Sequence, residues 1–234
     1  QKTHFITYII FLILLMFLFQ GFLGWFMVSS GLTDRADVSH IRLAIHLLMA
    51  FILSALILWE FLKIKHPDYF NNFQISNNKK LILSINAIFI LTILQIIYGA
   101  FVAGLDAGMI YNQFPKMGEG IIPQEIYHSV NFWYDIINNP VMVQFIHRFI
   151  AISLIVMILS VGFYAYKINQ TNEINLRYFK ILIFLTFIQF SLGVFTLLTQ
   201  VEILPAILHQ LTALLLFANI IILKFDYKYL QRSI

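Results

Sequence analysis

Three histidines at matching positions in long apolar runs are the residues of this sequence whose type and spacing point most clearly to chemistry. Each is followed four residues later by alanine, in the segments HLLMA, HRFIA and HQLTA, which begin at His46, His147 and His209. Residues four apart share one face of a helix. The small alanine leaves room beside the imidazole for a flat group or for a neighbouring backbone.

The apolar run before each histidine carries a second repeated pair, a glutamine with glycine four residues later. The three copies are QGFLG, QIIYG and QFSLG, which begin at Gln20, Gln95 and Gln189. We therefore interpret the repeated unit as a hairpin, with Gln-x-x-x-Gly in its first helix and His-x-x-x-Ala at the start of its second. We expect the glutamines to form hydrogen bonds between helices.

Several kinds of chemistry could use three such histidines. A single histidine in a span often only bonds to a neighbouring helix, but the repetition makes that explanation weak here. Zinc or non-haem iron favours carboxylate or cysteine partners, and the spans offer only Glu60 and Asp106, at their ends. A proton relay is possible, although relays combine histidine with Asp or Glu.

Haem suits the pattern better. Neutral imidazole is an axial ligand of haem iron, and helical bundles present such ligands from facing helices. Arg148 follows His147 directly, and Arg42 lies one turn before His46, so either guanidinium could meet a haem propionate. Because a bis-His haem needs two helices, two hairpins would form one four-helix bundle around one haem.

Three histidines leave one without a partner. Either one site is five-coordinate, or a further hairpin precedes this chain, which begins with Gln1 and not with Met. We expect the second alternative. The remaining histidines lie at helix ends or in loops and receive no role; they are His4, His40, His66 and His128.

Composition predicts the elements that position these residues. The chain of 234 residues is 60% hydrophobic and 11% charged, against roughly 25% charged residues in soluble domains. Apolar runs of about 20 residues mark membrane-spanning helices. The fold class is thus an all-α polytopic membrane protein, with six spans expected at residues 5–28, 42–62, 81–103, 141–166, 179–199 and 204–223.

The charges predict the orientation of the spans. Of the 15 Lys and Arg residues, 11 lie on the side of the N-terminus and of the loops 63–80 and 167–180. By the positive-inside rule this side is cytoplasmic. The net charge of +4 is therefore explained without a nucleic-acid partner, and the absence of cysteine excludes disulfides and thiolate sites within this chain.

The outer segment 104–140 is too long for a plain connection. After Pro123, the apolar residues Ile126, Val130, Trp133 and Ile137 recur at helical spacing. This pattern predicts a short amphipathic helix on the outer membrane surface, with a packed surface loop as the alternative.

Longer motifs identify a family. QGFLGWFMVSSGL, VSHIRLAIHLLMA, GAFVAGLDAGMIYNQFPKMG, QFIHRFIA and LHQLTA together resemble haem A synthase in its alphaproteobacterial and mitochondrial form, over the last six of that family's eight helices. The resemblance implies that residues 1–62 are the second hairpin of a truncated substrate bundle and that 63–80 is a cytoplasmic linker. It makes residues 81–234 a haem b-binding bundle that includes the loop 104–140.

The resemblance also implies an activity, oxidation of the C8 methyl group of haem O to a formyl group, which gives haem A for cytochrome oxidase. His147 and His209 would bind the iron of a haem b cofactor, and His46 would be an axial ligand of the substrate haem. The family's Glu-x-x-His-Arg motif is absent from this chain, so no catalytic residue is assigned. Asp106, Tyr111 and Asn112 would shape the outer loop over a haem edge.

The resemblance places the protein in a bacterial inner membrane, with both termini of this chain cytoplasmic. Besides haem O and haem A, the expected partners are the lipid bilayer, haem O synthase, cytochrome oxidase assembly factors and a second copy of the chain. Two rival functions remain. A b-type cytochrome would use the same bis-His haem only for electron transfer. A transporter with inverted repeats would show broken helices at the membrane midplane.

Overall fold

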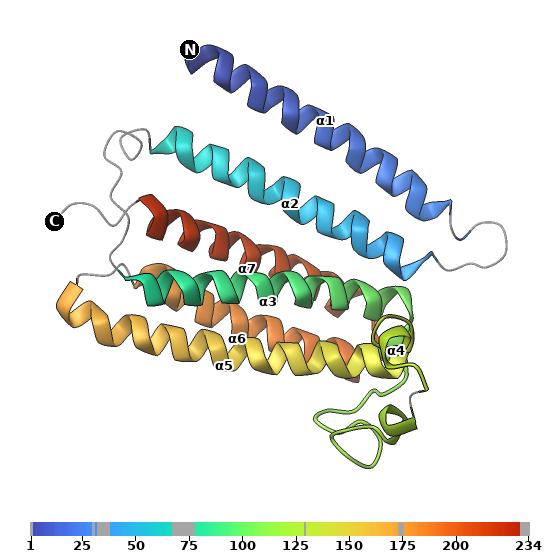
Figure 1. The fold of residues 1–234 in the computed structure, drawn as a ribbon. Coiled ribbons are helices and arrows are strands. Elements are labelled where there is room, and N and C mark those ends of the chain that lie inside the picture. Colours follow the sequence, from blue (N-terminus) through green and yellow to red (C-terminus); the bar gives the residue numbers. More distant parts are fainter. Residues whose placement is uncertain are drawn as a thin grey trace.

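The computed structural model describes residues 2–29, 31, 38–66, 78–128, 130–172 and 176–229, and its regular structure is helical throughout that part of the chain. Six long helices run side by side (Figure 1). They are α1 (Lys2–Val28), α2 (His40–Lys65), α3 (Lys79–Gly104), α5 (Pro140–Asn172), α6 (Arg177–Leu198) and α7 (Ile203–Tyr229). The predicted all-α fold class is confirmed.

These six helices are long and apolar enough to cross a membrane, so the chain has the character of a multi-pass membrane protein. Most of them extend beyond the apolar runs, because helix formation continues into the flanking polar residues. At the start of α3, for example, the side chain of Asn78 accepts a hydrogen bond from the backbone N–H of Leu81 at 3.1 Å. Such a cap satisfies one of the free N–H groups of a first turn.

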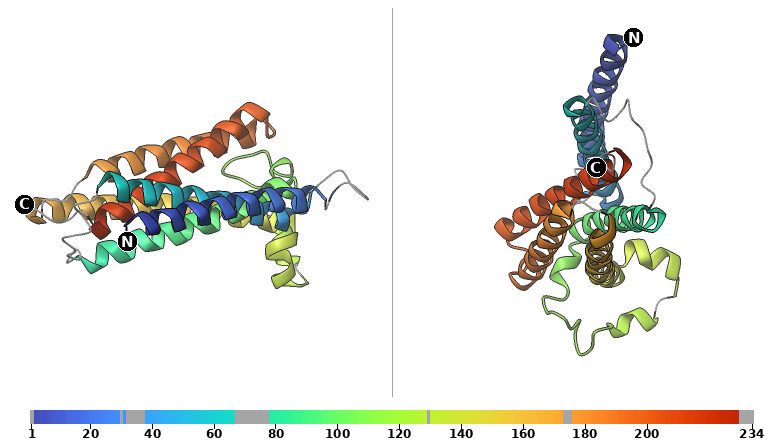
Figure 2. Two further views of the ribbon diagram at one scale, coloured as in Figure 1. Left: turned by 90° about the horizontal axis from the view of Figure 1, so that it is seen from above. Right: turned by 90° about the vertical axis from the view of Figure 1, so that its left-hand side faces the viewer.

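Four of the helices are in cyclic contact. α3 packs on α5, α5 on α6, α6 on α7, and α7 on α3, so that α5 and α7 lie diagonally across the group. Buried apolar residues from all four helices fill its interior, among them Ile88, Ile158, Leu182 and Ile220. α2 packs against α3 and α7, and α1 packs along α2 on the outside (Figure 2).

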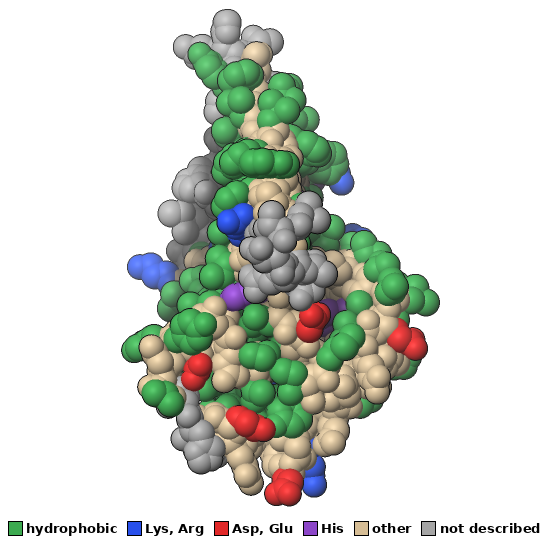
Figure 3. All heavy atoms as spheres, turned by 90° about the vertical axis from the view of Figure 1, so that its right-hand side faces the viewer, with side chains coloured by type: hydrophobic (Ala, Val, Ile, Leu, Met, Phe, Trp, Pro, Cys, Tyr) green, Lys and Arg blue, Asp and Glu red, His purple; other side chains and the backbone are tan. Residues whose placement is uncertain are grey.

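The two ends of the helices differ in charge. Lysines lie at the end where α3 and α6 begin, which we call the basic end; they include Lys63, Lys65, Lys79, Lys80, Lys167 and Lys180. The opposite end, here the loop end, carries the described outer acidic residues Asp106, Glu119, Glu125, Asp135 and Glu202. Figure 3 shows this face, where Asp and Glu side chains are scattered among apolar ones. The distribution is the one predicted from the alternation of spans.

Residues 105–128 and 130–139 fold over the loop end. They contain two short 3₁₀ helices, η2 (Ala107–Met109) and η3 (Gln124–His128), and the short helix α4 (Phe132–Asn138). The prediction of one continuous amphipathic helix through Ile126, Val130, Trp133 and Ile137 is wrong, because these residues lie in or between two separate short helices. Asn131 is extended and its side chain accepts from the N–H of Tyr134, which starts α4 anew.

Candidate functional site

Two hairpins of the four-helix group place a glutamine against the histidine of the following helix. In α3 and α5, Nε2 of Gln95 lies 3.2 Å from Nε2 of His147. In α6 and α7, Nε2 of Gln189 lies at the same distance, 3.2 Å, from Nε2 of His209. Both glutamines thus bond between helices as predicted, and the partner of each is the ring of the repeat's own histidine.

The hairpin of α1 and α2 repeats this contact in a different form. Nε2 of Gln20 lies 3.3 Å from Nδ1 and 3.4 Å from Nε2 of the His46 ring. It also donates a hydrogen bond to the His46 carbonyl oxygen at 3.0 Å. The local unit is therefore present three times, but His46 is held by its ring and by its backbone at once.

The glycines of the repeat make room for the imidazoles. A Cβ atom placed on Gly24, Gly99 or Gly193 would lie 3.2, 3.3 or 2.9 Å from Cε1 of the histidine in the same hairpin. These distances are shorter than ordinary van der Waals contacts, so a larger residue in place of the glycine would push the ring aside. The pair Gln-x-x-x-Gly is thus a cradle for one imidazole, with a donor on one turn and free space on the next.

The alanines after the histidines contribute to helix packing. Ala213 packs against a core cluster that includes Phe51, Ile96 and Phe217, and Ala151 is partly buried. Clearance for a flat ring beside them stays a prediction.

Hydrogen bonds also fix which nitrogen of His209 is free. Its Nδ1 lies 3.1 Å from the carbonyl oxygen of Gln189, and a carbonyl oxygen can only accept. Nδ1 therefore carries the proton, and Nε2 keeps a lone pair that accepts from the glutamine amide. Histidine binds a metal through an unprotonated ring nitrogen, while the other nitrogen of the same ring often donates to a backbone carbonyl. His209 has this form.

His147 lies on α5 and His209 on α7, and these two helices lie diagonally across the four-helix group. That the two rings face each other stays a prediction. His46, by contrast, is held by α1 through Gln20, on the outer side of α2. The expected grouping, one pair of histidines and one separate histidine, stays a prediction.

Arg148 anchors the outer loop. Its Nη1 donates to the carbonyl oxygens of Gln113 at 2.9 Å and Lys116 at 3.2 Å, and its Nη2 donates to that of Tyr111 at 2.8 Å. Its Nε is buried without a hydrogen-bond partner among the described residues. The guanidinium beside His147 thus ties the loop to the histidine-bearing helix, and its contact with a propionate stays a prediction.

Arg42 has a corresponding position in the hairpin of α1 and α2. It donates from Nη1 to the carbonyl oxygen of Phe26 at 2.9 Å, and its guanidinium lies 3.9 Å from the centre of the Phe26 ring. It therefore joins the end of α1 to the start of α2.

Two of the three loop residues singled out in the sequence fasten the loop. Asn112 donates to the carbonyl oxygens of Gly108 at 2.7 Å and Leu197 at 3.0 Å, and so connects the loop to α6. The hydroxyl of Tyr111 donates to a carboxylate oxygen of Glu125 at 2.7 Å. This bond is the largest of the effects that raise the pKa of the Tyr111 phenol above its ordinary value. Asp106 adopts a left-handed backbone conformation where α3 ends.

Sequence reasoning missed two features of the site. Gln144 is 2% exposed and donates to the Tyr111 carbonyl oxygen at 3.1 Å, beside the bond from Arg148. A polar residue one turn before Arg148 in an apolar run was the available signal. Thr92 and Thr186 also each precede a repeat glutamine by three residues, whereas Phe17 occupies that place before Gln20.

The fold and the site define a class, a helical multi-pass membrane protein in which each of three repeated hairpins holds one histidine against a glutamine. Residues 1–221 match the family model described as cytochrome oxidase assembly protein. The chain belongs to this family.

Curated relatives are named haem A synthase. The protein from Rickettsia bellii is 41% identical over 94% of this chain and 64% of its own length. The proteins from Wolbachia pipientis wMel and Rickettsia africae are each 40% identical, over 90% and 89% of this chain and 57% and 60% of theirs. The chain thus spans about three fifths of the length of these relatives.

Proposed function

We propose that this chain is the haem-binding part of a haem A synthase, and that α3, α5, α6 and α7 bind one haem b between His147 and His209. The observation that carries the proposal is the pair of cradled imidazoles on diagonal helices of one group. The names of the relatives support the activity, oxidation of the C8 methyl group of haem O to the formyl group of haem A.

The residues present fit a haem. Two neutral imidazoles, those of His147 and His209, would hold the haem iron, and Nε2 of His209 has its lone pair because Nδ1 is bonded to the Gln189 carbonyl. The amide oxygens of Gln95 and Gln189 are buried without a hydrogen-bond partner among the described residues. Such unsatisfied groups beside the imidazoles agree with a site that receives a further group. Haem b, when bound, supplies a one-electron carrier.

The chain's own residues then have distinct tasks. The two glycines leave each ring its space, and the Gln189 carbonyl holds the proton of His209 at Nδ1. Arg148 and Gln144 keep the outer loop against α5 through the Tyr111 carbonyl, which limits the access of water from the loop end. Asn112 fixes the same loop to α6.

The hairpin of α1 and α2 belongs to the substrate side in this proposal. His46 would hold the iron of the substrate haem O, Gln20 orients His46, and Arg42, one turn before it, would meet a propionate. The corresponding division is residues 1–62 for the substrate bundle, 63–80 for the linker and 81–234 for the cofactor bundle. The basic end lies in the cytoplasm of a bacterium, whose inner membrane holds the protein. Haem O synthase, cytochrome oxidase assembly factors and a second copy of the chain are its partners.

One experiment separates this function from its rival. The complete gene product that carries this chain is expressed in bacteria that make haem O but not haem A, and extracted haems are separated and identified by mass. We expect haem A to accumulate. A bis-His haem spectrum without haem A would show an electron-transfer cytochrome. The absence of both the haem spectrum and haem A would reject the proposed haem site as well.

A further inference from the structure

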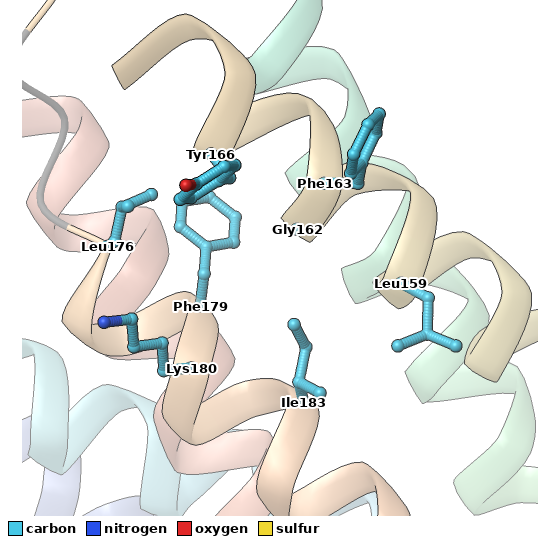
Figure 4. Close-up of a pocket in the computed structure, with 8 residues that line it drawn as sticks. All are labelled: Leu159, Gly162, Phe163, Tyr166, Leu176, Phe179, Lys180 and Ile183. Atoms are coloured by element: carbon cyan, nitrogen blue, oxygen red, sulfur yellow. The ribbon is translucent and has the colours of Figure 1, made fainter. Parts of the chain in front are cut away.

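A groove between α5 and α6 at the basic end lies far along the helices from the histidines. It has a volume of about 280 Å³ and is lined by residues of these two helices and of the segment just before α6 (Figure 4). α5 contributes Leu159, Gly162, Phe163 and Tyr166, which follow the i, i+3, i+4, i+7 spacing of one helix face.

The shape of the groove follows from one close contact. A Cβ atom on Gly162 would lie 2.8 Å from Cδ1 of Ile183, so α5 and α6 approach closely there. Phe179 is 2% exposed and forms the floor, whereas Phe163 is 70% and Tyr166 57% exposed along the open side. The open side is thus built from apolar surface on helices long enough to span a membrane.

The end of the groove nearest the membrane surface is polar. Lys180 lies in the first turn of α6, and Tyr166 lies near the end of the α5 span, which the structure places at Pro140–Asn169. Both are at the level where Lys and Tyr side chains meet lipid head groups. Lys180 is exposed, and the ion pair found among the described residues joins Lys63 and Glu60, elsewhere on this end. Among the described residues no carboxylate is paired with Lys180, so its exposed ammonium group can meet an anion.

We propose that this groove binds an anionic phospholipid, with one acyl chain along the apolar wall and its phosphate at Lys180 Nζ and the Tyr166 hydroxyl. The occupant must be amphipathic, because the groove is apolar for two turns and cationic only at its rim. Basic pockets between spans on the positive side of a membrane protein bind anionic head groups. A zwitterionic lipid would bring its own cation close to Lys180.

The test is a lipid titration followed by native mass spectrometry of the detergent-purified protein, with phosphatidylglycerol and phosphatidylcholine of matched chains. We expect phosphatidylglycerol to be retained preferentially. Lys180→Gln should lower its apparent affinity by about fivefold, because one lysine near the surface contributes about 1 kcal/mol toward anionic lipid. Lys167→Gln is the matched control, an exposed lysine at the same end that does not line the groove.

A second variant tests the apolar wall. Phe163→Ala should weaken the retention of phosphatidylglycerol while its preference over phosphatidylcholine stays, and Lys180→Arg should keep both. Equal retention of the two lipids by the unchanged protein would overturn the proposal. An equal loss in Lys167→Gln and Lys180→Gln would also overturn it, because diffuse surface charge would then explain the binding. Neither readout involves haem, so the result is independent of the proposed function.

Discussion

The hairpin of α1 and α2 and the two hairpins that follow it contain the same local unit in different surroundings. In each, a glutamine bonds to the histidine ring and a glycine makes room for it. Yet 17% of the apolar window of α2, the helix that bears His46, is buried in the structure, against 33% for α5 and α7, which bear His147 and His209. The first hairpin thus differs in the burial of its histidine-bearing helix and in the additional bond from Gln20 to the His46 carbonyl oxygen.

This difference separates two levels of organisation. The cradle is a property of one hairpin, because its residues lie on two helices that are neighbours along the chain. The proposed pairing of His147 with His209 would be a property of the four-helix group, because it needs two hairpins packed across from each other. His46 lies in a cradle but has no second histidine hairpin packed opposite it among the described residues. Its hairpin also has Phe17 where the other two have a threonine three residues before the glutamine.

Substitution of the cradle glycines should show the largest difference between the hairpins. Gly193→Ala places a Cβ atom 2.9 Å from Cε1 of His209, so the ring must shift. Overpacking of this kind costs about 1–3 kcal/mol, which corresponds to a loss of roughly 5- to 150-fold in haem affinity. Haem retention and the electron paramagnetic resonance of the bis-His centre measure it.

The other two glycines provide the comparison. Gly99→Ala should have a smaller effect, since its Cβ contact with His147 is 3.3 Å, and Gly24→Ala should leave the haem b signal unchanged. A loss of the signal in Gly24→Ala equal to that in Gly193→Ala would show that the hairpins do not act separately.

Removal of the glutamine amides should give the next largest effect. Gln189→Leu leaves Nε2 of His209 without its donor, which costs about 1–3 kcal/mol for a buried group. Haem iron would take the same lone pair, so the loss should be smaller in the haem-loaded protein. Thermal unfolding in detergent should therefore show a larger stabilisation by haem b in Gln189→Leu than in the unchanged protein. An equal stabilisation in Gln189→Leu and Gln20→Leu would contradict this assignment.

Loosening of the outer loop should give the smallest effect. Arg148→Gln removes hydrogen bonds to three loop carbonyls. The Met117 amide, bonded to the Gly120 carbonyl at 2.7 Å, should then exchange its hydrogen about tenfold faster. Arg42→Gln, which removes a carbonyl contact in the first hairpin, should leave Met117 unchanged. If exchange at Met117 is the same in Arg148→Gln as in the unchanged protein, Arg148 does not hold the loop.

The sequence predicts the spans and the repeated unit well because both depend on short-range patterns. Apolar length determines the six helices, and the Gln-x-x-x-Gly and His-x-x-x-Ala spacings place residues on single helix faces. The loop was harder, because its structure depends on backbone carbonyls that no side-chain pattern reveals. Arg148 bonds to three of them. The prediction of a continuous helix through Val130 is wrong because Asn131 is extended and its side chain caps the N-terminus of a separate helix, α4.

The central claim is that one haem b is bound between His147 and His209 while His46 belongs to a separate site. The visible and electron paramagnetic resonance spectra of the purified complete gene product, with each histidine changed to alanine in turn, test it most directly. We predict that His147→Ala and His209→Ala each abolish the low-spin bis-His signal of haem b and that His46→Ala retains it. Survival of the signal in either of the first two variants, or its loss in His46→Ala, would contradict the account.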